Sequence, residues 1–235
     1  MTTDRDAFRH TARLLRYGKI LKASQQEPEQ YTCKVLSKTF VVRAGVFSPK
    51  YFADTEFSVR EMSIRQGEEF LEIGCGTGVA SVFALLRGAG RAVAIDINPR
   101  AVQNTLENGR LHNVAGKLRA FVGDVYDALA PAATFDTIFW NIPSGYTDRQ
   151  EVLMMEKAIF DPGYRSIKKF LSGAPRHLKE SGRLLLCFSP TLGQEDVLRN
   201  LLRQTGFAVT IIAAMEIPHS YPVKFELLQA SLRQT

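Results

Sequence analysis

The chain has few cysteines and no apolar run long enough to cross a membrane as a helix. Its 235 residues include three cysteines, Cys33, Cys75 and Cys187, with no CxxC pair among them. An odd and scattered set argues against a disulfide framework, so we predict that all three are reduced. The four histidines are also dispersed and show no metal-ligand spacing, so no metal is predicted.

The first ten residues also lack the apolar segment of a signal peptide. Together with the missing membrane span, this predicts a cytoplasmic protein with no membrane partner. The basic excess is mild, because 30 Lys and Arg against 24 Asp and Glu give a net charge of +6. It is densest in the first 22 residues, at a three- or four-residue spacing. We interpret this as a solvated helix face, with a nucleic-acid contact as the alternative. No motif predicts an oligomeric state.

Length and an apolar content of 45% predict one full α/β domain with a modest extension. We expect the domain over residues 46–235 and the extension, an N-terminal helix and β-hairpin, over residues 1–45. The helix is predicted over about residues 3–24, with an apolar face formed by Phe8, Ala12 and Leu15. Residues 31–43 alternate and are rich in β-branched side chains, which predicts two short strands joined near Ser37 and Lys38.

From residue 69 onward, predicted strands and helices alternate with short connections. This pattern is typical of right-handed βαβ crossovers and a parallel sheet. We expect strands at 69–73, 91–95, 118–123, 135–140 and 183–189, and helices at 78–88, 99–112, 163–178 and 195–205. Two last strands, at 208–215 and 224–230, flank a proline-containing turn and are predicted to pair antiparallel.

The most informative motif is a strand that ends on a carboxylate and runs into three alternating glycines. Glu72 lies at the strand end, and Gly74, Gly76 and Gly78 follow it. Glycine allows a sharp turn and a close approach of the backbone to a ligand, and the helix that follows offers free N–H groups. A dinucleotide fingerprint would need glycine where Val79 stands, so the predicted ligand is not a dinucleotide.

Two further predicted strands also end on acids, Asp96 and Asp124. Each alone is often only the N-cap of the next helix. In an open parallel sheet, however, the carboxyl ends of the strands form the ligand crevice, so these two acids and Glu72 should converge there. The joint pattern therefore favours a binding site over three separate caps.

This pattern resembles class I S-adenosylmethionine-dependent methyltransferases, whose first motif, E/D-x-G-x-G-x-G, is matched by Glu72 and the three glycines. The resemblance implies a Rossmann-like α/β fold with a seven-stranded, mostly parallel sheet in the order 3-2-1-4-5-7-6 and a reversed last strand. It also implies S-adenosylmethionine as cofactor, with Asp96 accepting from the ribose hydroxyls, Asp124 accepting from the adenine amino group and Val125 against the ring. The other cofactor-binding residues that it implies are Gly74, Cys75, Gly76, Thr77, Gly78, Ile97 and Asn141.

The strand at residues 135–140 runs into the turn Asn141-Ile-Pro-Ser-Gly-Tyr146. It resembles the N/D-P-P-Y/F motif of enzymes that methylate planar nitrogens: adenine N6, cytosine N4, or the glutamine amide in HemK-type protein methyltransferases. The lone pair of an amide or amino nitrogen is delocalised, so methyl transfer requires that the acceptor nitrogen is aligned with the methyl group. The Asn141 side-chain oxygen and the Ile142 carbonyl are placed to accept hydrogen bonds from the two N–H groups of that acceptor. The candidate catalytic residues are Asn141, Ile142, Pro143 and Tyr146.

Two positions depart from that motif: Ile142 replaces the first proline and Ser144 replaces the aromatic residue. The second change removes a stacking surface, which Tyr146 would have to supply by folding back. A plain strand-to-turn connection is the alternative, because Asn, Pro, Ser and Gly are turn formers. Of the aromatic residues Tyr51, Phe52, Trp140, Tyr146 and Tyr164, we expect Tyr51 and Tyr146 in the pocket wall and the others in the core.

The HemK-type resemblance extends over roughly residues 46–207. It includes the turn Val46–Pro49, the turn Asp161–Tyr164, the phrase Ala174–Lys179 and Gly182. The first 45 residues do not match the helical domain of dedicated release-factor methyltransferases.

The leading hypothesis is an S-adenosylmethionine-dependent N-methyltransferase that transfers its methyl group in line to an amide or amine of a protein side chain or small molecule. An RNA or DNA base is the alternative acceptor, which basic residues around the crevice mouth would favour. A non-catalytic subunit with the same fold is a third hypothesis, against which the intact acids at three strand ends argue. The residues do not identify the acceptor, nor whether its reacting atom is N, O or C.

Overall fold

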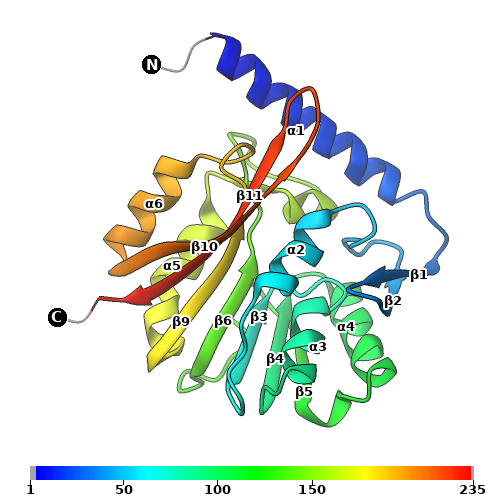
Figure 1. Cartoon of the computed structure of the whole chain (residues 1–235), viewed down its shortest axis with the longest axis vertical. Helices are drawn as coiled ribbons and strands as arrows, with labels where there is room; N and C mark the ends of the chain where they lie inside the picture. The colour runs from blue at the N-terminus through cyan, green and yellow to red at the C-terminus, as the bar shows by residue number, and fades with distance from the viewer. Residues whose placement is uncertain (1–3, 234–235) are drawn as a thin grey trace.

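The computed structural model describes residues 4–233, and its core is a seven-stranded sheet between two layers of helices (Figure 1). The predicted helix start at residue 3 lies outside the described residues, as do the outermost ends of the predicted extension and domain. The strands of the sheet are β3 Glu69–Ile73, β4 Arg91–Asp96, β5 Leu118–Val122, β6 Phe135–Asn141, β9 Leu178–Phe188, β10 Phe207–Ile217 and β11 Val223–Leu232.

The strand order confirms the predicted fold class. The sheet runs β10-β11-β9-β6-β3-β4-β5, which is the order 3-2-1-4-5-7-6 when the strands are counted from β3 and read from β5. β3, β4, β5, β6 and β9 pair in parallel, while β11 is antiparallel to both of its neighbours. The reversal follows from the short connection at residues 218–222, because parallel strands need a much longer crossover.

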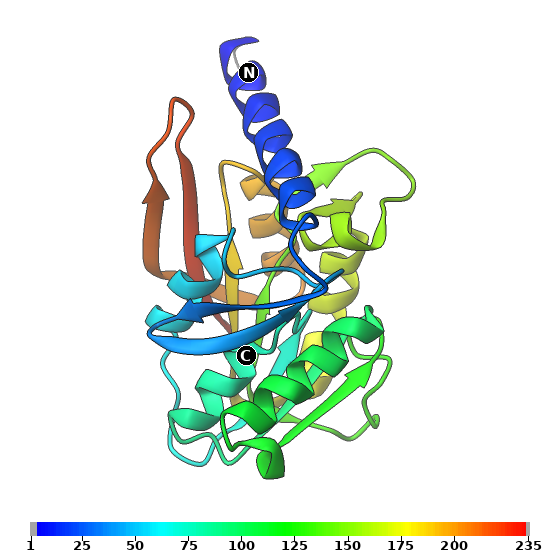
Figure 2. The same ribbon diagram turned by 90° about the vertical axis from the view of Figure 1, so that its right-hand side faces the viewer.

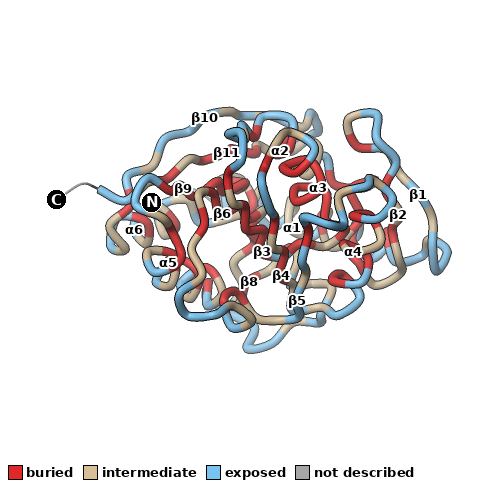
Figure 3. Tube along the Cα trace, turned by 90° about the horizontal axis from the view of Figure 1, so that it is seen from below, coloured by how far each residue is buried: buried red, intermediate tan, exposed pale blue. Residues whose placement is uncertain are grey.

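Side chains that alternate along each strand divide the interior into two cores. Phe70 packs with α2 Ala53–Glu61 and α3 Val79–Leu86, whereas Leu71 and Ile73 pack with α5 Arg165–His177 and α6 Glu195–Gln204. α4 Pro99–Leu111 packs against α3, β4 and β5. Buried segments are concentrated in the central strands (Figure 3).

The N-terminal segment forms α1 Asp4–Ser24 and a hairpin of β1 Gln30–Val35 and β2 Lys38–Arg43. The predicted hairpin is confirmed, and its turn residues Leu36 and Ser37 have φ values of 45° and 67°, as a two-residue hairpin turn requires. Buried side chains of both elements join the core of α2 and α3: Tyr17, Leu21, Val35 and Phe40.

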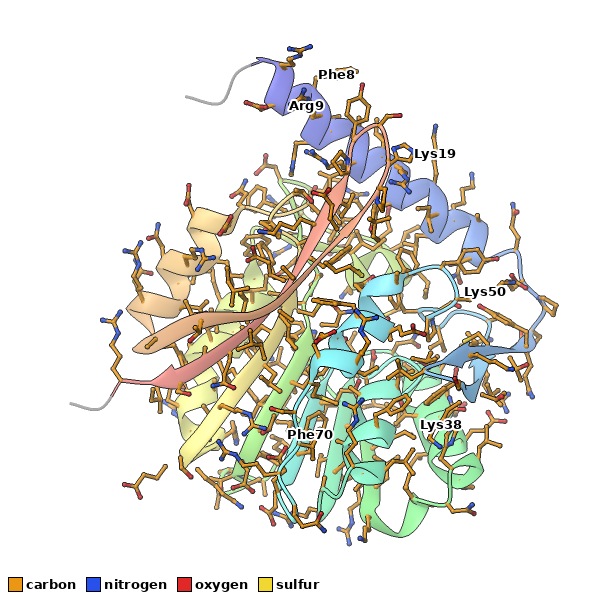
Figure 4. The ribbon with its side chains drawn as sticks, viewed as in Figure 1. Phe8, Arg9, Lys19, Lys38, Lys50 and Phe70 are labelled. Atoms are coloured by element: carbon orange, nitrogen blue, oxygen red, sulfur yellow. The ribbon has the colours of Figure 1, made fainter. Side chains whose placement is uncertain are left out.

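The predicted apolar face of α1 is wrong. Phe8 and Leu15 are each 63% exposed, and the buried residues of the helix are Tyr17, Leu21 and Ser24. Both sets of residues have the spacing of one helix face, so the sequence alone does not decide which face is buried. The part of the molecule against which α1 packs decides it. The polar side also makes contacts, because the Arg13 Nε donates to the carbonyl of Pro222 at 2.9 Å. Figure 4 shows Phe8, Arg9 and Lys19 along α1, far from Phe70 in the sheet.

Several short elements escaped prediction. Two three-residue strands, β7 Gly145–Thr147 and β8 Phe160–Pro162, pair in parallel next to the sheet. Two single 3₁₀ turns, η1 Ala115–Lys117 and η2 Met154–Ala158, complete the fold, and β9 begins five residues before the predicted strand. No helix within residues 4–233 combines the length and apolar character needed to cross a membrane.

Two buried asparagines of α4 fix the hairpin to the rest of the molecule. Figure 2 shows the hairpin lying beside α4. Asn104 accepts from the Arg43 N–H at 2.9 Å and donates to the Val41 carbonyl at 2.8 Å. Asn108 accepts from the Val41 N–H at 2.8 Å and donates to the carbonyls of Val41 and Thr77, at 2.8 and 2.9 Å. Asn108 therefore joins the hairpin to the glycine loop.

We predict that Asn108→Ala lowers the free energy of unfolding by about 2–3 kcal/mol, because the part-buried Val41 N–H and the buried Thr77 carbonyl lose this hydrogen-bond partner. Urea denaturation measures the change. The matched control is Asn200→Ala, at an exposed position on α6, with an expected change within about 0.5 kcal/mol. Equal effects of the two substitutions would show that the hydrogen bonds of Asn108 contribute no stability.

Candidate functional site

A cavity of about 740 Å³ opens where the strands of the central sheet end. Its wall includes Glu72 of β3, Asp96 of β4, Asp124 after β5 and Asn141 of β6. The chain crosses from β3 toward β4 and β5 on one side, and returns to β6 on the other, so the cavity lies at the switch point of an open α/β sheet. The structure thus brings together the three acids that the sequence placed at strand ends.

The three glycines of the loop have different roles. A Cβ at Gly74 would lie 2.9 Å from the Trp140 indole nitrogen, and a Cβ at Gly78 would lie 2.7 Å from the Thr105 side chain. A Cβ at Gly76 would meet nothing nearer than Phe47, at 4.0 Å. Gly76 lines the cavity with Gly74, whereas Gly78 does not. Gly78 is packed closely against Thr105 of α4, and its predicted contact with the ligand stays a prediction.

Glu72 is buried beside α3. Its Oε2 accepts from the Ser81 N–H at 2.8 Å and from the Ser81 hydroxyl at 2.5 Å. Burial raises the pKa of Glu72 to about 8, against the lowering effect of the Ser81 bonds. The site therefore holds a carboxyl group close to the balance between its neutral and ionised forms, and a nearby positive charge would favour the ionised form.

Asp96 connects two loops of the site. Its Oδ2 accepts from the Gly76 N–H at 2.9 Å and its Oδ1 accepts from the Asn98 N–H at 2.8 Å. Burial raises the pKa of Asp96, and the two backbone bonds oppose that rise. Each carboxylate oxygen keeps further lone-pair capacity, so hydroxyl donors can still bind there. The next residue, Ile97, is 37% exposed and also lines the cavity.

Asp124 has a partner that sequence reasoning missed. Lys169 of α5 donates to the Asp124 Oδ2 at 2.8 Å and to Asp127 at 2.7 Å. No motif connects residues 45 positions apart, so only the fold shows this pair. Val125 follows in a left-handed conformation, with a φ of 58°, and its buried side chain lines the cavity.

Cys75 and Thr77 also line the cavity. The Cys75 sulfur accepts from the Thr105 hydroxyl at 3.2 Å, and burial raises the pKa of its thiol well above the ordinary value. The thiol therefore stays protonated, as a packed side chain does. Among residues 4–233 no group of three or more His, Cys, Asp or Glu is arranged to hold a metal ion.

Asn141 faces the cavity from the end of β6. Its Nδ2 donates to the Oδ2 of Asp54, in the first turn of α2, at 2.6 Å. Because the nitrogen of the amide is used in this bond, its oxygen is the free end. Pro143 lines the cavity too.

Ile142 and Tyr146 are not part of the cavity wall, and their predicted catalytic roles stay predictions. The Ile142 side chain is buried in the core, and its carbonyl accepts from the Ser144 hydroxyl at 3.4 Å. Tyr146 belongs to β7, which is held by β8, and its ring lies edge-on to Tyr164 with centroids 5.4 Å apart. A side chain fixed in a paired strand cannot fold back over Asn141.

Other expectations for aromatic residues also change. The Tyr51 hydroxyl donates to Glu27, away from the cavity, whereas Trp140, which was expected in the core, lines it. Tyr164 is fully buried, and its hydroxyl donates to the Ser144 carbonyl at 2.7 Å. The aromatic residues of the cavity wall are Phe47, Phe139, Trp140 and Phe160.

The outer wall is formed by segments that no motif marked. The stretch after β7 supplies Gln150, Glu151, Val152, Met154, Met155, Lys157 and Ala158, and α2 supplies Thr55, Ser58 and Val59. Leu153 and Met154 are 75% and 44% exposed. This wall joins the deep, acid-lined part of the cavity to the surface.

Comparison with known proteins gives a consistent result. Residues 37–211 match the family described as methyltransferase small domain. A Methanocaldococcus jannaschii protein with the provisional name protein N5-glutamine methyltransferase is 31% identical over 65% of this chain and 77% of its own length. The release factor glutamine methyltransferase of Aquifex aeolicus is 30% identical over 75% of this chain and 66% of its own. The chain thus spans just under two thirds of that second relative.

A solved structure has a fold similar to that of this chain. The T. thermophilus 16S rRNA N2 methyltransferase, in complex with AdoMet and guanosine, superposes with a TM-score of 0.64. It is 20% identical in sequence, and the match covers 87% of this chain and 50% of that one. At this identity the likeness concerns the fold alone.

The raised pKa of Glu72 predicts a pH-dependent stability. Between about pH 4.5 and 8 the folded state binds the Glu72 proton and the unfolded state does not, so this residue lowers stability as pH rises. We expect Glu72→Gln to gain at least about 1 kcal/mol over the wild type between pH 5 and pH 8. Denaturant titrations at both values measure it. Glu180→Gln, at an exposed position, is the control and should follow the wild type. The prediction is contradicted if the difference in free energy of unfolding between Glu72→Gln and the wild type is the same at pH 5 and pH 8.

The glycine loop gives a second, paired prediction. Gly76 and Gly78 both have positive φ values, 53° and 75°, so alanine costs about 1 kcal/mol of strain at either. Gly78→Ala adds a clash with Thr105 and should lower the melting temperature more. Gly76→Ala should instead weaken S-adenosylhomocysteine binding by about tenfold or more, because its methyl group enters the cavity wall. Calorimetry and thermal unfolding of both variants separate the two roles, and the reverse ranking would refute this assignment.

Proposed function

The chain belongs to the methyltransferase small domain family, and on that basis we propose that it methylates the side-chain amide nitrogen of a glutamine in another protein. It is an S-adenosylmethionine-dependent methyltransferase with the class I fold. The observation that carries the proposed acceptor is the free amide oxygen of Asn141 in the cavity wall.

The residues of the cavity fit S-adenosylmethionine. That cofactor supplies, when bound, an electrophilic methyl group on a positively charged sulfur. We propose that Asp96 accepts from the ribose hydroxyls and that Asp124, held by Lys169, accepts from the adenine amino group beside Val125. Glu72 would hold the ammonium group, since a positive charge offsets the burial of its carboxylate. Gly76 leaves the space that a close ligand needs.

Asn141 would orient the acceptor. An amide NH₂ group donates two hydrogen bonds, and the Asn141 oxygen accepts one of them. Held in this way, the delocalised lone pair of the acceptor nitrogen points out of the amide plane at a fixed angle, so the barrier falls through alignment rather than through a strong base. Pro143 stiffens the backbone directly after Asn141, because its ring fixes φ.

The charge of the cavity wall favours a protein acceptor over a nucleic acid. Its lining includes five acidic residues, Glu72, Asp96, Asp124, Glu151 and Asp161, against two basic ones, Lys157 and Arg165. Phosphate backbones are bound by basic surfaces, so this wall suits them poorly. Position 144 is a serine and therefore offers no ring for a base to stack on. Its hydroxyl instead accepts from the Ser189 N–H at 2.9 Å. Both relatives named above carry the name of a glutamine methyltransferase, the first of them provisionally.

We further propose that the N-terminal 45 residues brace the cofactor site. The hairpin is bound to α4 through Asn104 and Asn108, and Asn108 also holds the Thr77 carbonyl of the glycine loop. We also propose the cytoplasmic location that the sequence predicts. It is supported by the three free cysteines, because thiols stay reduced in such a compartment.

The proposed acceptor predicts where a labelled methyl group goes. Incubating the protein with a cell extract and isotopically labelled S-adenosylmethionine should label a protein, and fragment mass spectrometry should place the methyl group on a glutamine. Asn141→Ala should abolish labelling and change S-adenosylhomocysteine affinity by less than about twofold, because it removes only the acceptor contact. Asp96→Ala should weaken that affinity by about tenfold or more.

Calorimetry supplies the affinities in this experiment. Label in RNA or in a small molecule would overturn the proposed acceptor. Equal loss of labelling and of affinity in Asn141→Ala would assign this residue to the fold rather than to the reaction.

A further inference from the structure

We propose that Asp54 is a positioning residue for the methyl acceptor, because it holds the Asn141 side chain with the amide oxygen, and not the nitrogen, toward the cavity. The inference rests on the proposed function, since it explains how the site selects an acceptor that carries N–H groups. It concerns a residue in the first turn of α2 that no sequence motif marked.

The geometry permits only one orientation of the amide. The two side chains lie 87 positions apart in the sequence, yet the Asn141 Nδ2 and the Asp54 Oδ2 are 2.6 Å apart. In this bond the Asp54 oxygen accepts and the NH₂ end of the asparagine donates, and the bond opposes the rise that burial causes in the pKa of Asp54. The amide is planar, and its oxygen is therefore turned away from Asp54. An asparagine without such a partner has two nearly equivalent orientations.

Asp54 is poorly placed for stability alone. It is 5% exposed, no cation pairs with it among residues 4–233, and its Oδ1 is buried without a hydrogen-bond partner there. The neighbouring ionisable groups are Tyr17 of α1 and Cys187 of β9, whose own pKa values the Asp54 carboxylate raises. Burying a charge with a single partner costs several kcal/mol, so a purely structural position would not retain it.

Another buried acid, Asp161 of the cavity wall, shows what a structural role requires. Asp161 lies in β8, just before α5, and accepts from the backbone N–H groups of Ser166 and Ile167 in the first turn of that helix, at 3.1 and 2.9 Å. Asp54 occupies the first turn of α2, but its recorded side-chain bond goes to Asn141. The helix N-terminus therefore gives Asp161 two backbone donors from the helix, whereas the only backbone donor that affects the pKa of Asp54 is its own N–H.

The orientation has a direct chemical consequence. With its oxygen in the cavity, Asn141 accepts from an N–H donor and disfavours a bare carbonyl or ether oxygen, whose lone pairs it would oppose. With the amide reversed, the site would present N–H groups and favour such oxygens instead. Asp54 thus fixes the polarity of the acceptor site, and Asn141 makes the contact.

Two substitutions isolate this role. Asp54→Leu removes the acceptor oxygen, and Asp54→Asn keeps one but removes the charge. We expect Asp54→Leu to lower the initial rate of labelling of extract protein by at least about tenfold, with S-adenosylhomocysteine affinity within about twofold of the wild type. Asp54→Asn should recover most of that rate. Glu68→Gln is the matched control: Glu68 is a buried carboxylate, 3.3 Å from Arg183 and outside the cavity, so stability should fall while the rate does not.

The amide orientation is also measured without any acceptor. In ¹H–¹⁵N spectra the Asn141 side-chain pair, assigned by its loss in Asn141→Ala, should show one proton shifted downfield by the short bond, and Asp54→Leu should remove that shift. Unchanged Asn141 signals in Asp54→Leu, or equal rate losses in Asp54→Leu and Glu68→Gln, would overturn the inference. If the wild type labels no protein, the proposed function fails, but these spectra still decide whether Asp54 orients the amide.

Discussion

The site depends on carboxyl groups that are buried with little positive charge to balance them. Glu72, Asp96 and Asp54 all have raised pKa values with burial as the main cause, and Asp96 contributes further to the shift of Glu72. Desolvation disfavours the ionised form of each. A positively charged ligand offsets that cost, and a neutral one of the same shape does not. The cavity thus selects for charge as well as for shape.

The scaffold that holds these groups consists of strand ends joined by hydrogen bonds between neighbouring loops. Asp96 binds the Gly76 N–H across two strands, and Ser81 holds Glu72 from the helix that follows the loop. Asn108 ties the same loop to Val41 of the hairpin, which lies 67 positions from Asn108 in the sequence. Each contact crosses between elements, which is why the N-terminal segment belongs to the same core as the helices of the methyltransferase domain.

The sequence was sufficient for features that depend on local pattern and on the geometry of parallel sheets. The alternation of strands and helices predicted a parallel sheet, the family resemblance implied its strand order, and acids at successive strand ends predicted the cavity. Features set by side-chain direction were not predictable. The buried face of α1 depends on its docking partner, and the place of Tyr146 depends on the short β7–β8 pair. Lys169 and Asp54 act on site residues across long sequence separations, so neither leaves a motif.

The bonds around the glycine loop also bear on binding kinetics. The loop is already fixed by the Asp96 carboxylate, the Thr105 hydroxyl on the Gly76 carbonyl and the Asn108 amide on the Thr77 carbonyl. A loop ordered before the ligand arrives loses little conformational entropy on association. Encounter with the cofactor should then need no folding step in the loop, and differences in affinity among cofactor analogues should arise in their dissociation rates.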